Sequence, residues 1–491
     1  MNRKIRQLAA ALMVLYVVLF AAMNYWQVGR ESDLNAMGGN TRAIRREFSR
    51  ARGEIVSADG VVAARSVPLP DDNEFPYQRE YPTGELFANV TGYYSLALGA
   101  TQLERTQNAV LTGQTAQQRI GNIEDVFTGG EGTGNVHMAL RADLQETARQ
   151  ALAGRNGSVV MLDVQTGAVL AMYSNPTYDP NLIVDPNFDA ARAALEQLLE
   201  APGNPLLANA YQDRFMPGST FKVLTTGIGL ETGTITLDSQ FERLTEWVPP
   251  QTSNPIQNYD GTNCGGDLRE VFRRSCNIAF AQTALNVGVD GMLNGVRAWG
   301  VGEPVPIDLP RPAASTFGTT DNLDQQLPLL AMRGFGQQED QMVPLHMAMV
   351  AATVANNGVM MKPYVVASTT DSQGRTLTRT RPEEWRRPIS PQTAATLNSL
   401  MQSVATDGTA SCCLQLDGGV PVAAKTGTAQ LNEAGEPELS HAWIVAFAPA
   451  DQPRYAVAVV LLGSDEVSAS TGGRLAGPVA QQMLNEALAN G

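Results

Sequence analysis

Three short polar motifs, spread between residues 217 and 428, constrain this chain more than any other feature. The chain holds only four lysines in 491 residues, and two of them fall inside the first and third motifs. A buried lysine amine can lose its proton, whereas an arginine stays charged and cannot act as a base. We therefore expect a fold that joins the three motifs in one site, namely Pro217-Gly218-Ser219-Thr220-Phe221-Lys222, Ser275-Cys276-Asn277 and Lys425-Thr426-Gly427-Thr428.

The first motif predicts a serine at the start of a helix. Pro217-Gly218 is a turn signal, and apolar spacing continues from there to residue 230. Residues three apart share a helix face, so the Lys222 amine can reach the Ser219 hydroxyl. A serine needs a base to become a nucleophile, and an amine can serve if burial or another cation lowers its pKa. In the alternative interpretation, Ser219 only caps a helix and Lys222 is solvated. This interpretation would be preferred for the first motif alone, but the presence of the other two motifs favours the catalytic one.

The second motif is predicted to lie on a loop between helices. The Ser275 hydroxyl could relay a proton between Lys222 and a leaving amine. The Asn277 amide could donate to Lys222 or to a substrate carbonyl. In isolation, three such residues are equally consistent with an ordinary polar turn.

The third motif follows an apolar run at residues 420–424 that is typical of a strand. On a strand, Lys425 and Gly427 share one face, and Thr426 and Thr428 share the other. Gly427 leaves room for a second backbone, which suits a peptide laid along the strand edge. The Lys425 charge would attract a substrate carboxylate and help lower the pKa of Lys222. A lysine on a strand is otherwise common and needs no function.

Composition excludes some functions. A net charge of −14 and the lack of a basic cluster argue against nucleic-acid binding. The hydrophobic content of 43% indicates a globular chain, and the length suggests two or three domains. The three histidines, which are far apart in sequence, are His137, His346 and His441. No metal-ligand spacing occurs, so we expect no metal and no other cofactor.

The N-terminus predicts a membrane anchor. Arg3, Lys4 and Arg6 precede an uncharged apolar run at 8–26, which is about long enough to span a bilayer. Positive charge before the run predicts a cytoplasmic tail at 1–7 and a transmembrane segment at 8–27. A cleaved signal peptide is the alternative. The run is long for one and no clean Ala-x-Ala site follows, so an uncleaved anchor is favoured.

The four cysteines are consistent with an extracytoplasmic location. Cys264 and Cys276 lie close together around the second motif, so an oxidising compartment could join them. The adjacent pair Cys412 and Cys413 could bridge only in a strained way. The competing hypothesis is that all four cysteines are reduced and packed inside the protein.

The rest of the chain predicts two regions outside the membrane. Residues 28–140 are polar and turn-rich, with a hairpin around Asp59-Gly60 and a glycine-rich loop at 128–134. Residues 141–491 begin with a helix at 144–152 and two strands at 158–163 and 168–172. They end with strands at 442–447 and 455–462 and a helix at 478–488. This order predicts an α+β domain in which helices cover a central antiparallel sheet.

Together with the three motifs, several segments resemble the class B penicillin-binding proteins. These segments are Arg52-Gly53-Glu54-Ile55, Tyr81-Pro82-Thr83-Gly84, Gly92-Tyr93, Leu103-Glu104, residues 175–181, Gly336-Gln337, Val343-Pro344-Leu345 and Asn357-Gly358. The resemblance implies a penicillin-binding or serine β-lactamase-like transpeptidase domain, a β-rich non-catalytic pedestal (dimerisation) domain and one transmembrane helix. It also implies a peptidoglycan D,D-transpeptidase that cross-links stem peptides ending in D-Ala-D-Ala through a serine acyl-enzyme and is acylated by β-lactams.

The resemblance also implies roles for single residues. Ser219 would be the acylated nucleophile and Lys222 its base, with Ser275 and Asn277 as the second catalytic element. The backbone N–H groups of Ser219 and Thr428 would form the oxyanion hole. The substrate or antibiotic carboxylate would bind at Lys425, Thr426, Gly427 and Thr428. One departure is Gln338, which stands where the family often has a glycine and leaves the conformation of that loop open.

The implied setting is cell-wall synthesis at the plasma membrane, with an extracytoplasmic catalytic domain and partners from a division or elongation complex. A secreted β-lactamase shares the motifs but would lack the pedestal and anchor. A D,D-carboxypeptidase would resolve the same acyl-enzyme with water, and sequence does not separate the two acceptors. A bifunctional enzyme with a glycosyltransferase is disfavoured, because the region before residue 158 is too short. The alternative outside the enzyme class is a protein that acts mainly as a structural member of a division complex, with catalysis secondary.

Overall fold

The computed structural model describes residues 3–25, 48–70, 75–96, 98–121, 132–185, 187–319, 321–432 and 439–490. The chain forms two compact units, one of Met1–Ala51 with Val67–Gln78 and the other of Arg52–Ser66 with Arg79–Gly491. Residues 26 and 27 of the predicted anchor lie outside the described residues, as do residues 128–131 of the predicted glycine-rich loop. All the motif residues belong to the second unit.

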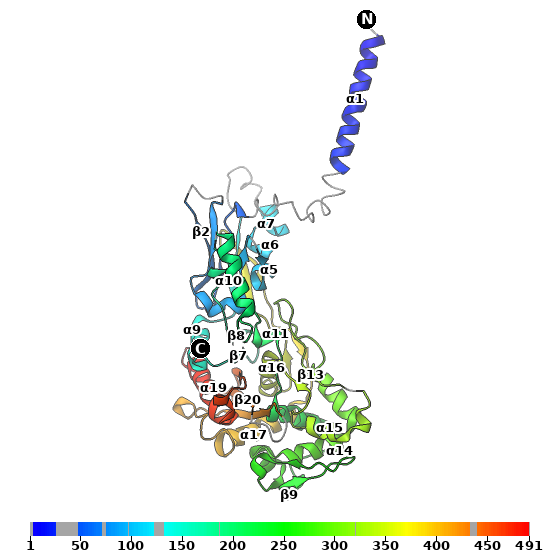
Figure 1. Ribbon diagram of the computed structural model, residues 1–491, viewed down its shortest axis with the longest axis vertical. Helices are drawn as coiled ribbons and strands as arrows, with labels where there is room; N and C mark the ends of the chain where they lie inside the picture. The colour runs from blue at the N-terminus through cyan, green and yellow to red at the C-terminus, as the bar shows by residue number, and fades with distance from the viewer. Residues whose placement is uncertain are drawn as a thin grey trace. The chain divides into compact units, whose positions relative to one another are not determined.

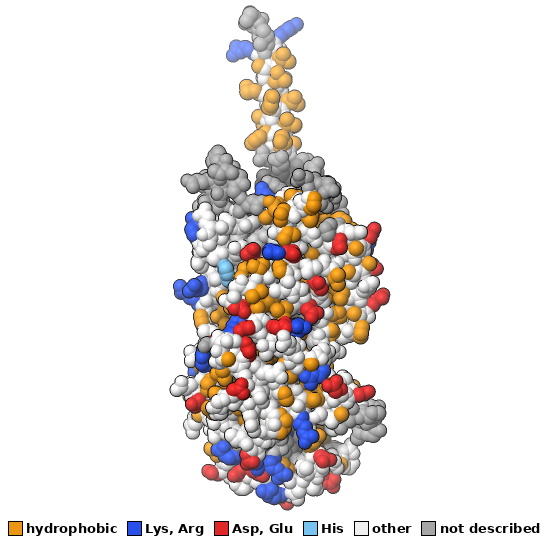
Figure 2. Space-filling view, turned by 90° about the vertical axis from the view of Figure 1, so that its left-hand side faces the viewer, with side chains coloured by type: hydrophobic (Ala, Val, Ile, Leu, Met, Phe, Trp, Pro, Cys, Tyr) orange, Lys and Arg blue, Asp and Glu red, His pale blue; other side chains and the backbone are white. Residues whose placement is uncertain are grey.

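The first unit contains the apolar helix α1 (Arg3–Asn24). The segment Arg6–Met23 is long and apolar enough to cross a membrane, and none of it is buried. Apolar side chains lie all along this helix in Figure 2. One such helix fits a single-pass membrane protein, as the sequence predicts.

A six-stranded sheet has the order β17-β16-β6-β1-β2-β3. The predicted hairpin at Asp59-Gly60 is confirmed, because β1 pairs antiparallel with β2. Strands β16 and β17 come from far downstream: β16 pairs with β6, and β17 pairs with β16, a connection that the sequence analysis did not anticipate. The strands are β1 (Ile55–Val56), β2 (Val62–Pro68), β3 (Tyr77–Glu80), β6 (Gly134–Met138), β16 (Val366–Asp371) and β17 (Thr376–Arg379).

A buried ion-pair triad lies in this N-terminal region. Glu104 is fully buried and accepts hydrogen bonds of 2.6 Å from both Arg52 Nε and Arg79 Nε. The Tyr81 hydroxyl donates to the same carboxylate at 3.2 Å. The nearby short elements are η2 (Gly84–Phe87), α4 (Ala88–Thr91), β4 (Tyr94–Ser95), β5 (Gly99–Ala100), α5 (Gln102–Thr106), α6 (Asn108–Leu111) and α7 (Ala116–Gly121).

A five-stranded antiparallel sheet of order β19-β20-β21-β7-β8 forms the centre of the larger domain (Figure 1). Its first and last strands in sequence meet, because β21 pairs with β7 along its whole length. Most of the strand side chains are fully buried. The strands are β7 (Gly157–Asp163), β8 (Val169–Asn175), β19 (Ala423–Gln430), β20 (Ser440–Ala448) and β21 (Tyr455–Leu461). This confirms the predicted α+β architecture.

Helices cover the sheet. The helices α9 (Ala142–Leu152) and α19 (Gly472–Ala489) pack against each other and against the sheet, and the wholly buried α16 (Pro344–Ala355) packs against β7, β20 and β21. The predicted closing helix at 478–488 was too short. It begins at Gly472, where an added Cβ would lie 2.1 Å from Gly427 O, so only glycine lets the helix start against the strand. Pro478 therefore lies inside the helix rather than at its start.

The remaining helices and strands lie around these layers. The helices are η3 (Pro180–Leu182), α10 (Phe188–Glu200), α11 (Asn209–Gln212), η4 (Gly218–Phe221), α12 (Lys222–Glu231), η5 (Tyr259–Gly261), α13 (Leu268–Arg273), α14 (Asn277–Ala298), η6 (Leu323–Gln325), α15 (Leu327–Arg333), α17 (Pro391–Asp407), η7 (Asp417–Gly419) and α18 (Asp465–Ser468). Short strands pair as β9 (Gln240–Leu244) with β12 (Cys264–Asp267), β10 (Glu246–Trp247) with β11 (Ile256–Gln257), β13 (Thr316–Phe317) with β14 (Asp340–Gln341), and β15 (Met360–Met361) with β18 (Glu384–Arg386).

Candidate active site

Ser219 lies in the turn η4 that leads into α12, as the sequence predicts. Its side chain is partly exposed, whereas its neighbours Gly218 and Thr220 are buried. Gly218 has φ +51°, and a Cβ there would lie 2.5 Å from Thr428 O. The turn therefore needs glycine both for its backbone conformation and for its close approach to β19.

Two residues to which the sequence analysis gave no role at the site, Gly336 and Trp443, hold this turn in place. Gly218 N donates to Gly336 O at 2.9 Å, so the segment after α15 supports the turn. Trp443 Nε1 on β20 donates to Met216 O at 2.9 Å, and Trp443 is fully buried opposite Gly427. A tryptophan within a buried strand signals that its N–H needs a partner, but sequence does not say which.

Lys222 is fully buried and reaches the second motif. Its Nζ contacts Ser275 O at 2.7 Å, Ser275 Oγ at 3.2 Å and Asn277 Oδ1 at 2.8 Å. It makes no hydrogen bond to the Ser219 hydroxyl in this conformation. The predicted direct contact between the two is thus replaced by contacts to Ser275 and Asn277, which supply three acceptors to a buried amine.

Lys425 on β19 approaches the same hydroxyl from the other side. Its Nζ donates to Ser275 Oγ at 2.8 Å and to Thr426 O at 2.9 Å. Ser275 has φ +61°, which lies in the left-handed region of backbone conformation. In this conformation its carbonyl and hydroxyl oxygens both accept from Lys222 Nζ. One hydroxyl therefore lies between two buried amines.

Burial sets the charge of both lysines. Burial, and then the charge of Lys425, lower the pKa of Lys222 well below 10.5. Burial alone lowers the pKa of Lys425 to about 7. Within the described residues no carboxylate forms an ion pair with either amine. The lowered pKa of Lys222 favours the uncharged amine that base catalysis requires.

The charge of Lys425 has a measurable consequence for catalysis. In Lys425→Met the pKa of Lys222 should rise, because a neighbouring cation is lost. The acid limb of the pH–rate profile for acylation by a penicillin should then move to higher pH, since that limb reports the free enzyme's base. Lys362→Met replaces a half-exposed lysine paired with Glu383 and is the matched control. An unmoved limb in Lys425→Met would contradict this coupling.

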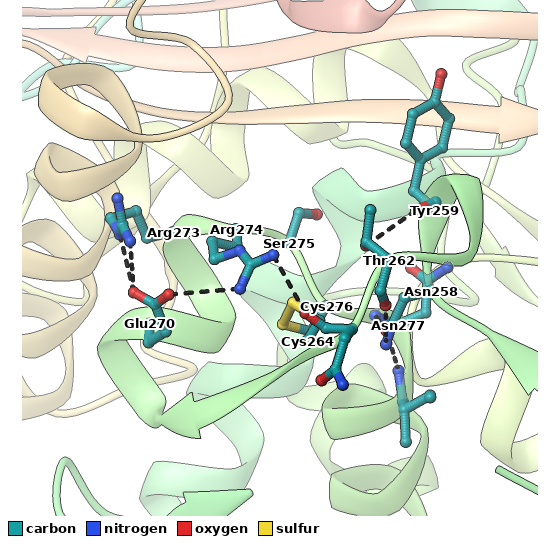
Figure 3. The surroundings of a disulfide bond; sticks show 12 residues. Asn258, Tyr259, Thr262, Cys264, Glu270, Arg273, Arg274, Ser275, Cys276 and Asn277 are labelled. Atoms are coloured by element: carbon teal, nitrogen blue, oxygen red, sulfur yellow. Dashed lines mark hydrogen bonds and ion pairs between the residues drawn. A yellow bond between two sulfur atoms is a disulfide. The ribbon is translucent and has the colours of Figure 1, made fainter. Parts of the chain in front are cut away.

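A disulfide holds the second motif. Cys264 on β12 is bonded to Cys276, as the first of the two hypotheses for these cysteines holds, and both cysteines are buried. Figure 3 shows the Cys264–Cys276 disulfide close to Ser275 and Asn277, with the ion pairs of Glu270 to Arg273 and Arg274 to one side. Asn258, which the sequence analysis missed, accepts from the backbone N–H groups of Asn277 (2.8 Å) and Ile278 (3.2 Å). It thereby caps α14 at the motif.

The third motif lies on β19, the edge strand of the five-stranded sheet. A Cβ on Gly427 would lie 2.7 Å from Pro217 O, so this face abuts the nucleophile turn. Thr426 Oγ1 hydrogen-bonds Thr409 Oγ1 at 2.6 Å, and Thr428 Oγ1 accepts from Gly472 N at 3.3 Å. The alternation predicted for a strand is therefore observed. No group of metal-binding side chains occurs in the described part of the chain.

A serine in a turn before a helix, a buried lysine pair around one hydroxyl and an edge strand thus lie together in one α+β domain. Residues 157–485 match the family described as penicillin binding protein transpeptidase domain, and residues 52–136 match the penicillin binding protein A dimerisation domain. The chain therefore belongs to the penicillin-binding protein transpeptidase family.

Relatives and solved structures of penicillin-binding protein A resemble this chain over its length. It is 38% identical to peptidoglycan D,D-transpeptidase PbpA of Mycolicibacterium smegmatis, over all of both chains. It is 36% identical to PbpA of Mycobacterium tuberculosis over 99% of each. The crystal structure of PBPA from M. tuberculosis matches with a TM-score of 0.82 and 35% identity, covering 90% of this chain and all of that one. Its penicillin G acyl-enzyme complex matches equally well. The resemblance to the class B penicillin-binding proteins is confirmed, and within that class the chain is similar to penicillin-binding protein A.

Proposed function

We propose that this protein is a peptidoglycan D,D-transpeptidase whose acyl-enzyme forms on Ser219. The observation that carries the proposal is the meeting of all three motifs at one point, where Ser275 Oγ lies between the amines of Lys222 and Lys425. The relatives named above are peptidoglycan D,D-transpeptidases, which agrees with this activity.

In the first half-reaction, Ser219 Oγ attacks the carbonyl carbon of the penultimate D-alanine of a stem peptide. Neutral Lys222 takes the hydroxyl proton, after a small movement of either side chain from the present geometry. The oxyanion accepts hydrogen bonds from the backbone N–H groups of Ser219 and Thr428, whose segments are in contact. Ser275, next to Lys222, passes a proton to the departing D-alanine nitrogen.

In the second half-reaction, an amine of a neighbouring stem peptide attacks the acyl-enzyme. Its proton returns through the same lysine and hydroxyl, the cross-link forms and Ser219 is released. Asn277 holds Lys222 through its Oδ1. A β-lactam follows the first half-reaction only, because its ring-opened leaving group remains attached to the acyl chain.

Substrate binding is assigned to β19. A donor peptide lies along this edge strand, where backbone groups are available for pairing. The terminal carboxylate meets Lys425, Thr426, Gly427 and Thr428. Thr426 and Thr428 must exchange their present partners, or share them, to take part.

The site belongs outside the membrane. We assign residues 1–7 to the cytoplasm, 8–27 to the bilayer of the plasma membrane, 28–140 to a pedestal domain and 141–491 to the catalytic domain. Two disulfides within the catalytic domain are consistent with an oxidising compartment. Proteins of a division or elongation complex are the proposed partners of the pedestal.

Peptide mapping tests the nucleophile. After labelling with a fluorescent penicillin, trypsin should release the label on residues 215–222, since Arg214 and Lys222 bound that peptide. A label on any other peptide would exclude Ser219. A stem-peptide substrate offered with an amine acceptor should then yield the cross-linked dimer, and hydrolysis alone would make the enzyme a carboxypeptidase.

A further inference from the structure

A second disulfide lies on the catalytic domain, between the sequence neighbours Cys412 and Cys413. Cys412 is exposed and Cys413 is partly exposed. The first disulfide differs in this respect, since Cys264 and Cys276 are only 4% and 1% exposed. Thiol–disulfide exchange requires access of a thiolate to a sulfur atom, so the two bonds should differ in reactivity.

The exposed disulfide is on a short loop with firmly held ends. Ala410 and Leu414, on either side of it, are buried at 0% and 1% exposure. Ala410 N donates to Val404 O at 3.1 Å, and Cys413 N donates to Ala410 O at 3.0 Å. Because the two ends of the loop are fixed, breaking or forming the disulfide should change the backbone conformation within the loop rather than move the loop as a whole.

The loop contacts the proposed substrate strand. Thr409, one residue before the buried Ala410, hydrogen-bonds Thr426 of β19 at 2.6 Å. Helix α19 packs closely behind the loop, because a Cβ on Gly473 would lie 2.3 Å from Thr409 O and one on Gly477 would lie 2.9 Å from Cys413 O. The loop thus occupies the space between the helix and the strand.

We propose that Cys412–Cys413 is a thiol–disulfide exchange site, and that its redox state adjusts substrate binding at β19 through Thr409. This regulation rests on the proposed function of β19. The reactant is a small thiol. Its thiolate attacks the exposed Cys412 Sγ, the S–S bond breaks, and Cys413 leaves as a thiolate. A second thiol releases Cys412, so two external thiols become one disulfide and two electrons reach the cysteine pair.

Opening the bond changes the loop because the bridged ring contains the peptide bond between the two residues. Reduction frees that backbone, and the hydrogen bond from Thr409 to Thr426 is weakened. One neutral hydrogen bond corresponds to about a two- to tenfold change in an equilibrium constant. None of the hydrogen bonds of residues 409–413 reaches Lys222 or Ser275, so the chemical step is unaffected.

The exchange is tested on the full-length protein in detergent, without denaturant. Dithiothreitol is the probe, and iodoacetamide followed by peptide mass spectrometry reports the free thiols. Alkylation should appear on Cys412 and Cys413 while Cys264 and Cys276 stay bonded, so the buried bridge is the internal control. Resistance of Cys412–Cys413 until the protein is unfolded, or earlier reaction of Cys264–Cys276, would overturn the proposal. This readout does not depend on acylation.

The second arm measures penicillin acylation in both redox forms. Reduction should lower the concentration for half-maximal rate about two- to tenfold with an unchanged maximal rate, because Thr426 then exchanges Thr409 for the penicillin carboxylate more readily, and reoxidation should reverse it. Cys412→Ser/Cys413→Ser should behave as the reduced form. In Thr409→Val the difference between redox forms should vanish. Equal half-saturation in both forms would refute the link to β19, whereas loss of all Ser219 labelling would refute the proposed function instead.

Discussion

Lys222→Arg is expected to acylate about 10²–10⁴-fold more slowly with a penicillin than the unchanged protein, the range typical of general base catalysis. Arginine stays protonated at any usable pH, so it cannot accept the Ser219 proton. The natural amine is fully buried, its pKa is lowered first by burial and then by Lys425, and no carboxylate among the described residues forms an ion pair with it. Acylation rates should be measured by time-resolved fluorescent labelling.

Two further variants separate lost chemistry from lost folding. Lys222→Met has nearly the shape of lysine in a pocket lined by the rings of Phe280 and Phe335, and it should fold yet remain as slow as Lys222→Arg. Lys362→Arg changes a half-exposed lysine and should keep the full rate. Labelling of a folded Lys222→Met within a few fold of the normal rate would show that another group deprotonates Ser219.

Local sequence pattern was sufficient for the elements that position the site. Apolar runs on either side of short turns predicted β7, β8, β20 and β21, and the turn signal at Pro217-Gly218 predicted the start of the helix that follows Ser219. The pairing of β16 with β6 could not be predicted, because it joins residues more than two hundred positions apart through backbone hydrogen bonds that carry no residue signature. The closing helix was misplaced because proline is common at helix starts, whereas here two glycines start the helix.

The candidate site was predicted as a set of residues rather than as a set of contacts. Spacing on one helix suggested that Lys222 would point at Ser219, yet its amine lies against Ser275 and Asn277 from a different loop. That choice depends on tertiary packing, including the left-handed backbone at Ser275 and the cap provided by Asn258. The disulfide between Cys264 and Cys276 was only one of two hypotheses, since sequence does not place two cysteines within bonding distance.

The buried ion-pair triad at Glu104 should contribute strongly to the stability of the N-terminal region. Its carboxylate bonds two guanidinium groups, and all three side chains are at most 3% exposed. Burial by itself would raise the pKa of Glu104, but the charges of Arg79 and Arg52 outweigh burial and lower that pKa below 4.5. A neutral replacement would leave two buried cations without their counter-ion.

Glu104→Gln should therefore lose about 3–5 kcal/mol of unfolding free energy, the cost typical of removing one partner from a buried ion pair. Glu80→Gln removes the same charge from an exposed pair with Arg65 and should cost under about 1 kcal/mol. Urea unfolding of both variants gives the comparison. The ionised Glu104 contributes stability above its unfolded pKa of about 4.5, and this contribution is lost as pH falls through the lower folded pKa. The difference in unfolding free energy between Glu104→Gln and the unchanged protein should therefore shrink in acid. A difference that stays constant from pH 7 downward would mean that packing rather than charge holds the triad together.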